Sequence, residues 1–231
     1  MQIKHLFFDL DRTLWDFEKN SHDELVSLYH KYQLHQKGIS LADEFIKVYK
    51  KINNKCWEKY RKNLITKDKL RTERFLQTLI YFGIENNDLA DNLGTDYVNN
   101  SPHRTILIDG TIDLLKRLDG HFSMHIITNG FEEVQWVKLE KSGLLPYFDK
   151  VITSERVGVK KPDPKIFHYA LDKANALLNE SVMIGDDLKT DIIGAIQIGM
   201  KCIYYNPDGN VNKYPVWREV KSLLKIKEIL L

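Results

Sequence analysis

The sequence predicts an α/β fold, a doubly wound parallel sheet with a helical bundle inserted into the chain. Five short apolar runs have the character of buried parallel strands, and they lie at residues 3–8, 124–128, 150–154, 182–185 and 201–205. Helical patterns at 134–142, 164–176 and 192–198 separate the later runs. Strands that alternate with helices at this spacing indicate βαβ units, with helices on both faces of one sheet.

The inserted bundle is predicted because more than a hundred residues separate the first run from the second, far beyond a crossover helix. Residues 16–98 show almost no strand signal and repeat apolar residues at helical spacing. We therefore expect a core of residues 1–15 and 99–231 and a helical domain of residues 16–98. Pro102 and the turn formers of 99–110 would return the chain to the core, where a helix starts at Gly110.

Composition narrows the functional class. With 231 residues, 43% hydrophobic and 29% charged, the chain is an ordinary globular protein. Its formal charge of +2 comes from scattered residues and gives no reason to expect a nucleic acid polymer as partner. No window supplies about 18 apolar residues for a membrane span, and the run before Asp9 is too short for a signal peptide, so we expect a cytoplasmic protein. Cys56 and Cys202 indicate neither a disulfide nor a zinc site.

Two carboxylates, Asp9 and Asp11, end the first apolar run in the stretch FFDLDRT. If this run is a central strand, both side chains can reach one ligand site at the carboxyl edge of the sheet. Such a pair repels unless a cation or a shared proton compensates, which indicates a hard divalent metal or a proton-transfer role. The alternative is a pair of turn acids.

Two further stretches could bind an anion. Thr128, Asn129 and Gly130 end the second run just before a helix, where a hydroxyl, an amide and free N–H groups form an anion site. Considered alone, they favour a simple helix cap. In the stretch KKPDP, Pro162 holds Lys161 extended ahead of a helix, from where its ammonium could span a phosphate and a carboxylate. The alternative there is a surface lysine.

The fourth stretch, GDDLKTD, follows the apolar run 182–185 and holds Asp186, Asp187 and Asp191. Three acids in six residues exceed what a helix cap needs. An oxygen-rich cluster of this kind suits Mg²⁺, which prefers octahedral oxygen ligands.

Together the four stretches resemble the signature of the haloacid dehalogenase superfamily. That signature is D-x-D-x-T, a Thr or Ser after the second strand, a Lys before a later helix, and G-D-x-x-x-x-D, and all four occur in this order over residues 9–191. The resemblance implies a Rossmann-like core. The insertion at 16–98 resembles the helical cap domain of the family, which closes over the site and excludes water. Small phosphorylated molecules are the substrates it implies.

The resemblance also assigns roles. It makes Asp9 the nucleophile that forms an aspartyl-phosphate, and Asp11 the general acid and then the general base. Thr128, Asn129 and Lys161 would hold the phosphoryl group. Mg²⁺ would be bound by the Asp9 carboxylate, the Asp11 backbone carbonyl and Asp186, with Asp187 and Asp191 in the outer shell.

Asp11, the lack of membrane spans and two longer stretches narrow the class of reaction. Asp11 argues against a dehalogenase, because those members lack an acid there, and the lack of membrane spans argues against an ion pump. Phosphomonoester hydrolysis is then favoured over a sugar-phosphate mutase. The stretches FDLDRTLWDF and GLLPYFDKVITSERVGVKKPDPKIFHYAL resemble the pyrimidine 5'-nucleotidase subgroup.

Several alternatives remain open at this point. They are a sugar-phosphate phosphatase, a phosphomutase, and a non-catalytic phosphate-binding or regulatory protein. We expect a monomer or homodimer, and we expect Trp15 and Phe17, among the aromatic residues, to approach the substrate.

Overall fold

The computed structural model describes residues 2–231 and divides into two compact units. The core unit holds the chain up to Phe17 and Thr105–Leu231, and the helical unit holds Glu18–Arg104. The sequence placed these borders after residues 15 and 98. The second border lies later because helix α4 (Asn87–Asn100) continues into the turn η2 (Ser101–His103), and Arg104 then pairs with Glu24 of the helical unit at 3.0 Å.

Six parallel strands form the sheet of the core unit, in the order β3-β2-β1-β4-β5-β6. They are β1 (His5–Phe8), β2 (Ser123–Thr128), β3 (Lys150–Thr153), β4 (Ser181–Gly185), β5 (Lys201–Tyr205) and β6 (Arg218–Val220). The predicted α/β fold with a doubly wound parallel sheet is confirmed, and its five predicted strands are present. The sixth, β6, was not predicted, because it has three residues and two of them are exposed.

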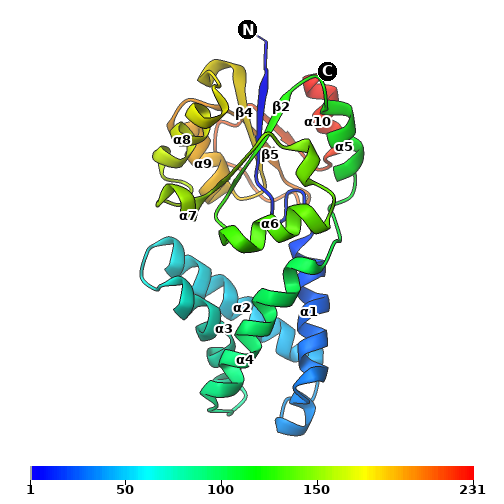
Figure 1. Cartoon of the computed structure of the whole chain (residues 1–231), viewed down its shortest axis with the longest axis vertical. Helices are drawn as coiled ribbons and strands as arrows, with labels where there is room; N and C mark the ends of the chain where they lie inside the picture. Colours follow the sequence, from blue (N-terminus) through cyan, green and yellow to red (C-terminus); the bar gives the residue numbers. More distant parts are fainter. Residues whose placement is uncertain (1) are drawn as a thin grey trace. The chain divides into compact units, whose positions relative to one another are not determined.

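Helices cover both faces of this sheet (Figure 1). The helices of the core unit are α5 (Thr111–Leu118), α6 (Glu132–Lys141), α7 (Ser154–Val157), α8 (Pro164–Ala174), α9 (Ile193–Gln197) and α10 (Leu224–Leu230). Short turns are η3 (Leu145–Tyr147), η4 (Leu178–Glu180) and the π-helical turn η5 (Leu188–Ile192). The apolar residues of α5, α6 and α10 pack on one face and those of α8 and α9 on the other.

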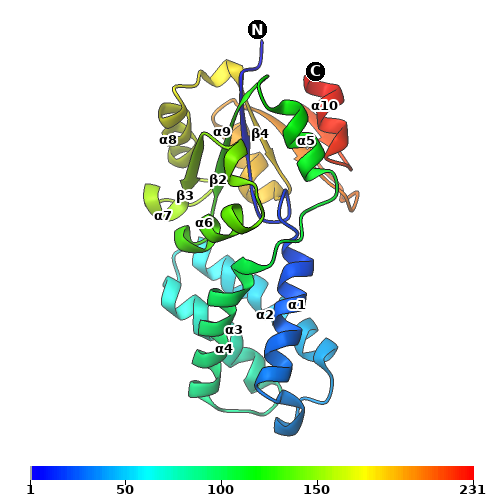
Figure 2. The same cartoon turned by 45° about the vertical axis from the view of Figure 1, so that its right-hand side comes forward.

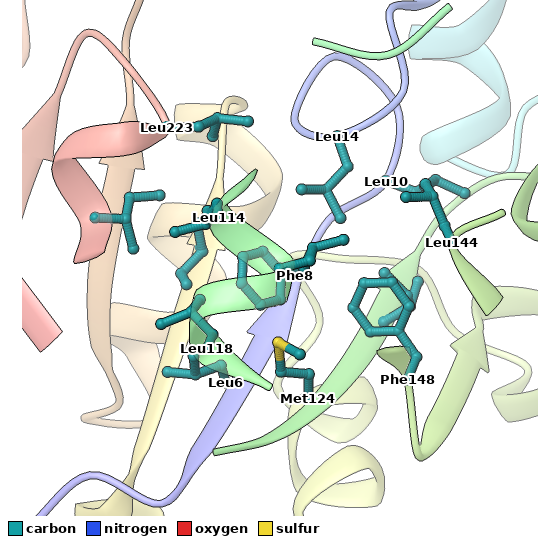
Figure 3. Close-up of a cluster of buried hydrophobic side chains, with 14 of the residues drawn as sticks. Leu6, Phe8, Leu10, Leu14, Leu114, Leu118, Met124, Leu144, Phe148 and Leu223 are labelled. Atoms are coloured by element: carbon teal, nitrogen blue, oxygen red, sulfur yellow. The ribbon is translucent and has the colours of Figure 1, made fainter. Parts of the chain in front are cut away.

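Alternation along β1 explains why both faces are apolar. Leu6 and Phe8 point into the cluster with α5, where Figure 3 shows them beside Leu114 and Leu118. Phe7 points to the opposite face and joins the cluster with α8 and α9. A strand that is buried on both sides reads as a continuous apolar run, as this one does.

The carboxyl ends of β2, β1 and β4 lie side by side at one edge of the sheet. From β1 the chain runs outward through β2 and β3, and it then returns to β4 on the other side of β1. Ligands of doubly wound sheets bind at such a switch point. The loop after β1 continues this edge, because the Asp9 amide donates to the Ile184 carbonyl at 2.9 Å.

The helical unit consists of α1 (Phe17–Lys31), α2 (Ala42–Arg61), α3 (Lys67–Tyr81) and α4, with a short turn η1 (Leu34–Lys37). The first turn of α1 crosses the border between the units. Helix α3 packs against both α2 and α4, as Figure 2 shows. The helical unit has its own core, formed by apolar side chains that include Leu25, Phe45, Tyr49 and Phe75. Among residues 2–231, no helix combines the length and the apolar character that crossing a membrane requires.

Candidate functional site

Three acids from separate segments meet at the carboxyl edge of the sheet. Asp9 follows β1, Asp186 follows β4 and Asp191 belongs to η5, and one carboxylate oxygen from each lies within 4.8 Å of the others. Asp9 is 8% exposed and Asp191 is 1% exposed. Gly185 permits this approach, because a Cβ there would lie 2.3 Å from Asp191 Oδ2.

Lys161 lies among these acids and is 2% exposed. Its ammonium donates to Asp9 Oδ1 at 2.5 Å, Asp191 Oδ1 at 2.7 Å and the Ile127 carbonyl at 2.7 Å. These three acceptors match the three hydrogens of an ammonium group. The main chain of Lys161 is fixed by Asn129, whose amide accepts from the Lys161 N–H at 2.8 Å and donates to its carbonyl at 3.0 Å. The Asn129 side chain therefore places Lys161.

Burial disfavours the charged form of each acid in this group. Burial raises the pKa of Asp9 well above its usual range, although the Lys161 ammonium opposes the shift. Burial also raises the pKa of Asp186 to about 7, with Asp191 adding to the shift and the Thr13 hydroxyl opposing it. The pKa of Asp191 is raised by burial as well. Burial alone lowers the pKa of Lys161, but the carboxylates of Asp191 and Asp9 outweigh it and the net shift is upward.

The acid cluster fits a divalent cation. When all groups are ionised, three carboxylates outnumber the one buried ammonium of Lys161, and the Arg12 guanidinium offsets part of the charge of Asp186. Carboxylate oxygens are the donors that hard divalent cations prefer. Asp186 contacts the Thr13 hydroxyl at 2.9 Å through Oδ1.

Asp11 lies two residues from Asp9 but has different partners. Its Oδ1 accepts from the Lys138 ammonium at 2.5 Å, and its Oδ2 accepts from the Gln135 amide at 2.9 Å. Both partners come from α6, one helical turn apart. Sequence reasoning missed them. The available signal was that Gln135 and Lys138 fall on the same stripe of the helix as the buried Leu139.

The loop after β2 holds Thr128 close to these groups. Thr128 Oγ1 accepts from the Gly130 N–H at 3.1 Å and from the Gln135 amide at 2.6 Å. The first amide of α6 is already used, since the Glu132 N–H donates to Glu155 Oε2 at 2.7 Å. Thr128 and Asn129 are thus tied into one hydrogen-bonded frame with Asp11 and Lys161.

The remaining expected residues have simpler surroundings. Asp187 caps η5, since its carboxylate accepts from the Lys189 N–H at 2.8 Å, and its own N–H donates to Asp191 Oδ2 at 3.2 Å. Trp15 is 1% exposed and packs in the apolar core with Leu14, and its expected approach to the substrate stays a prediction. Phe17 packs against the same cluster of the core unit.

Comparison with known proteins decides the family. The model of the haloacid dehalogenase-like hydrolases matches residues 3–199. The chain belongs to this family. It is therefore a hydrolase, and its resemblance to the superfamily is confirmed.

Relatives match along nearly the whole chain. The pyrimidine 5'-nucleotidase YjjG of Escherichia coli is 32% identical, with 100% of this chain and 99% of that protein covered. The pyrimidine 5'-nucleotidase PynA of Streptococcus pneumoniae is 31% identical, with 90% and 85% covered. The crystal structure of the HAD-hydrolase YfnB of Bacillus subtilis, described as bound to magnesium and showing interdomain movement, superposes with a TM-score of 0.90 at 28% identity, covering 100% and 99%.

Proposed function

We propose that this protein is a Mg²⁺-dependent phosphomonoester hydrolase that works through an aspartyl-phosphate on Asp9. Its substrate is a nucleoside 5'-monophosphate, of the kind that pyrimidine 5'-nucleotidases hydrolyse. One observation carries the proposal: Asp9 lies at the switch point of the sheet, paired at 2.5 Å with the buried Lys161 and surrounded by two further acids. A carboxylate in such surroundings is positioned for nucleophilic work, since a buried charge pair has little value as a stabilising contact.

In the first step an oxygen of Asp9 attacks phosphorus while the bond from phosphorus to the leaving oxygen breaks. Asp11, as a carboxylic acid, gives its proton to that leaving oxygen and becomes a carboxylate. A water oxygen then attacks the phosphorus of the aspartyl-phosphate while the bond from phosphorus to the Asp9 oxygen breaks, and Asp11 takes the proton from this water. Inorganic phosphate leaves, and Asp9 and Asp11 return to their starting forms.

Thr128 and Lys161 hold the phosphoryl group in this proposal, and Asn129 assists by fixing the main chain of Lys161. The Thr128 hydroxyl lies in the hydrogen-bonded frame that also contains Asp11 through Gln135. All three hydrogens of the Lys161 ammonium are donated to acceptors of the chain. When Asp9 turns to attack phosphorus, a phosphoryl oxygen takes its place as the third acceptor of the ammonium. This exchange keeps the ammonium neutralised throughout and places positive charge where negative charge develops.

The metal in this proposal is Mg²⁺, bound by the carboxylates of Asp9 and Asp186 and by the Asp11 backbone carbonyl, with Asp187 and Asp191 outside them. When bound, Mg²⁺ offsets the charge of the acids and polarises the phosphoryl oxygens. The excess of carboxylates over the ammonium of Lys161 in the acid cluster supports this assignment, and so does the magnesium described for YfnB.

The helical unit is proposed to act as a cap. It follows the Asp9 and Asp11 loop directly in the chain, and it has a core of its own, so it can move as a body. A lid that excludes water leaves room for a small phosphorylated molecule and none for a nucleic acid polymer. The names of YjjG and PynA favour a nucleotide over a sugar phosphate.

The test is release of inorganic phosphate by the purified protein with Mg²⁺ and with EDTA. The panel contains pyrimidine and purine 5'-monophosphates, hexose phosphates and p-nitrophenyl phosphate. We expect Mg²⁺-dependent release, fastest from a pyrimidine monophosphate. Asp9→Asn should lower kcat by about 1,000-fold or more while circular dichroism stays unchanged. The exposed Asp172 on α8 provides the matched control, and Asp172→Asn should leave kcat unchanged.

Each contradictory outcome has its own meaning. Release from none of the compounds by folded, Mg²⁺-loaded protein would exclude a phosphatase. Faster release from hexose phosphates would exclude the nucleotide assignment alone. Conversion of one hexose phosphate isomer to another with little free phosphate would show a mutase. Appreciable activity in Asp9→Asn would exclude Asp9 as the nucleophile.

A further inference from the structure

Helix α6 places a buried lysine and a buried glutamine against the proposed acid–base residue. Lys138 is 4% exposed and Gln135 is completely buried. Lys138 donates to one Asp11 oxygen at 2.5 Å, and Gln135 donates to the other at 2.9 Å. Because the two donors hold opposite oxygens, the Asp11 carboxylate cannot rotate without breaking one of these contacts.

Lys138 is itself held in place from a second side. Its ammonium lies 4.1 Å from the centre of the Trp15 ring, which is a favourable position for a cation above an aromatic face. Trp15 closes the loop that carries Asp11, because its carbonyl accepts from the Arg12 N–H at 2.8 Å. The loop after β1 and helix α6 are thus joined through Lys138.

Gln135 joins the same carboxylate to the proposed phosphate-binding group. Its amide nitrogen donates both to Asp11 and to the Thr128 hydroxyl, the latter at 2.6 Å. Gly130 leaves room for this side chain, since a Cβ there would lie 2.3 Å from the Gln135 amide nitrogen. The positions of the acid–base group and of the phosphoryl cradle are therefore linked by one side chain.

We infer that Lys138 is a positioning residue, which together with Gln135 orients Asp11 toward the leaving oxygen of the substrate. Each carboxylate oxygen can accept more than one hydrogen bond, so these two donors leave acceptor sites on Asp11 for the reacting groups. This inference rests on the proposed phosphatase function. Burying a lysine ammonium costs free energy of solvation unless the group is paired. The two contacts of Lys138 with the loop that carries Asp11 therefore indicate a role at that carboxylate.

The test uses the dependence of the rate on the leaving group. A nucleoside monophosphate has an alkoxide leaving group that needs a proton, whereas p-nitrophenolate leaves readily without one. We expect Lys138→Met to lower kcat/KM by about 10- to 100-fold for the nucleoside monophosphate and by less than about 3-fold for p-nitrophenyl phosphate. Lys138→Arg, which keeps the cation, should restore most of the loss. Lys141→Met changes an exposed lysine of the same helix and should change neither value.

A second measurement identifies Asp11 as the group through which Lys138 acts. In an Asp11→Asn background, adding Lys138→Met should cause no further loss of kcat/KM, because the carboxylate that it orients is gone. Gln135→Leu provides an independent variant with the same expected preference for p-nitrophenyl phosphate, and it decides the question if Lys138→Met fails to fold.

Two outcomes would overturn the inference while leaving the proposed function intact. One is an equal loss of kcat/KM for both substrates in the folded Lys138→Met and Gln135→Leu variants. The other is a full additional loss from Lys138→Met in the Asp11→Asn protein. Absence of phosphate release from the wild-type protein with either substrate would instead contradict the proposed function.

Discussion

The two ends of the central strands both bury titratable groups, but they handle charge differently. At the carboxyl end, Asp9 and its neighbouring acids surround the ammonium of Lys161. At the amino end, His5 of β1 and His125 of β2 are buried or half-buried together, with Nδ1 of His5 3.2 Å from Nε2 of His125. Their rings stack with centres 5.5 Å apart, and Phe7 packs on His125 at 4.8 Å.

Burial acts against charge at both ends, so the shifts have opposite directions. Burial raises the pKa of Asp186 to about 7, and it lowers the pKa of His125 to about 4 with His5 adding to that shift. At neutral pH the histidines are neutral, and one proton lies between Nδ1 of His5 and Nε2 of His125, while Nδ1 of His125 is buried without a hydrogen-bond partner among residues 2–231. Asp186, with a pKa of about 7, is partly charged at neutral pH, and a bound cation would compensate that charge. The buried acids at the carboxyl end therefore lower the stability of the protein at neutral pH. The neutral histidines at the amino end pack against each other and against Phe7.

The largest expected effect comes from removing the cation at the carboxyl end. Lys161→Met leaves Asp9 and Asp191 buried without their ammonium, and this should lower the free energy of unfolding by about 3–5 kcal/mol at pH 8. Phosphatase activity should be lost as well. Urea denaturation with EDTA measures the stability. Lowering the pH to 5 should recover part of the lost stability, because Asp9 and Asp191, which lack their ammonium partner in this variant, then take up protons.

Lys160 provides the matched control for this change. It precedes Lys161 in the same loop and is only half-buried, so Lys160→Met should alter stability by less than about 0.5 kcal/mol. If Lys161→Met proves as stable as the wild type at pH 8, the acids do not depend on that ammonium. The contrast between the two ends of the sheet would then fail.

A smaller effect is expected from neutralising Asp186. Its pKa in the folded protein, about 7, lies above the ordinary value of 3.8, so its contribution is fully present below about pH 4 and is lost as the pH rises through 7. Asp186→Asn should therefore stabilise the protein in EDTA by roughly 2 kcal/mol at pH 8, with little gain at pH 4. The melting temperature should rise on adding Mg²⁺ to the wild type and rise much less in the variant.

The exposed Asp208 serves as the control for Asp186. Asp208→Asn should leave both the pH dependence and the Mg²⁺ response as in the wild type. An undiminished Mg²⁺ response in Asp186→Asn would show that Asp186 does not bind the metal. An unchanged stability profile in EDTA would show that the charge of Asp186 is already compensated by other groups.

The fold was predictable from sequence where one local pattern determines one structure. The apolar runs that end at Phe8 and Thr128 indicated buried strands, and strand ends carrying acids indicated the edge of the sheet. Strand β6 was not predictable, since Arg218 and Glu219 are polar and exposed and only Val220 is buried. Its pairing with β5 is a tertiary contact, and a strand of this length has no periodicity of its own.

The candidate site was predictable in its positions but not in its contacts. Positions after predicted strands indicated that Asp9 and Asp186 lie at one edge of the sheet, and the resemblance to the superfamily added Lys161. The sequence could not show that the Asn129 side-chain amide makes hydrogen bonds with the backbone of Lys161, because that contact depends on how two loops meet. The helical period marks Lys138 as lying on the buried side of α6, and only the folded chain shows that Asp11 lies opposite it.

The smallest expected effect lies at the amino end, where the sign reverses. His125 has a folded pKa of about 4 and an ordinary value of 6.5, so below pH 6.5 the unfolded chain binds a proton that the folded protein does not. Stability should fall as the pH drops from about 6.5 to 4. His125→Phe keeps a ring beside Phe7 and removes the titration, so it should abolish about 1–2 kcal/mol of the loss between pH 8 and pH 5.

Comparing urea denaturation at pH 8 and pH 5 in EDTA isolates this change, since any constant cost of altering the packing cancels in the difference. His121→Phe, at an exposed position of the core unit, should keep the wild-type difference. In Asp186→Asn the loss of stability in acid that is due to His125 should remain, because the histidine pair and the acid cluster lie at opposite ends of the strands and their effects should add. If His125→Phe leaves the loss of stability between pH 8 and pH 5 unchanged, the buried histidines do not cause that loss. The two ends of the sheet would then not have opposite effects on the pH dependence of stability.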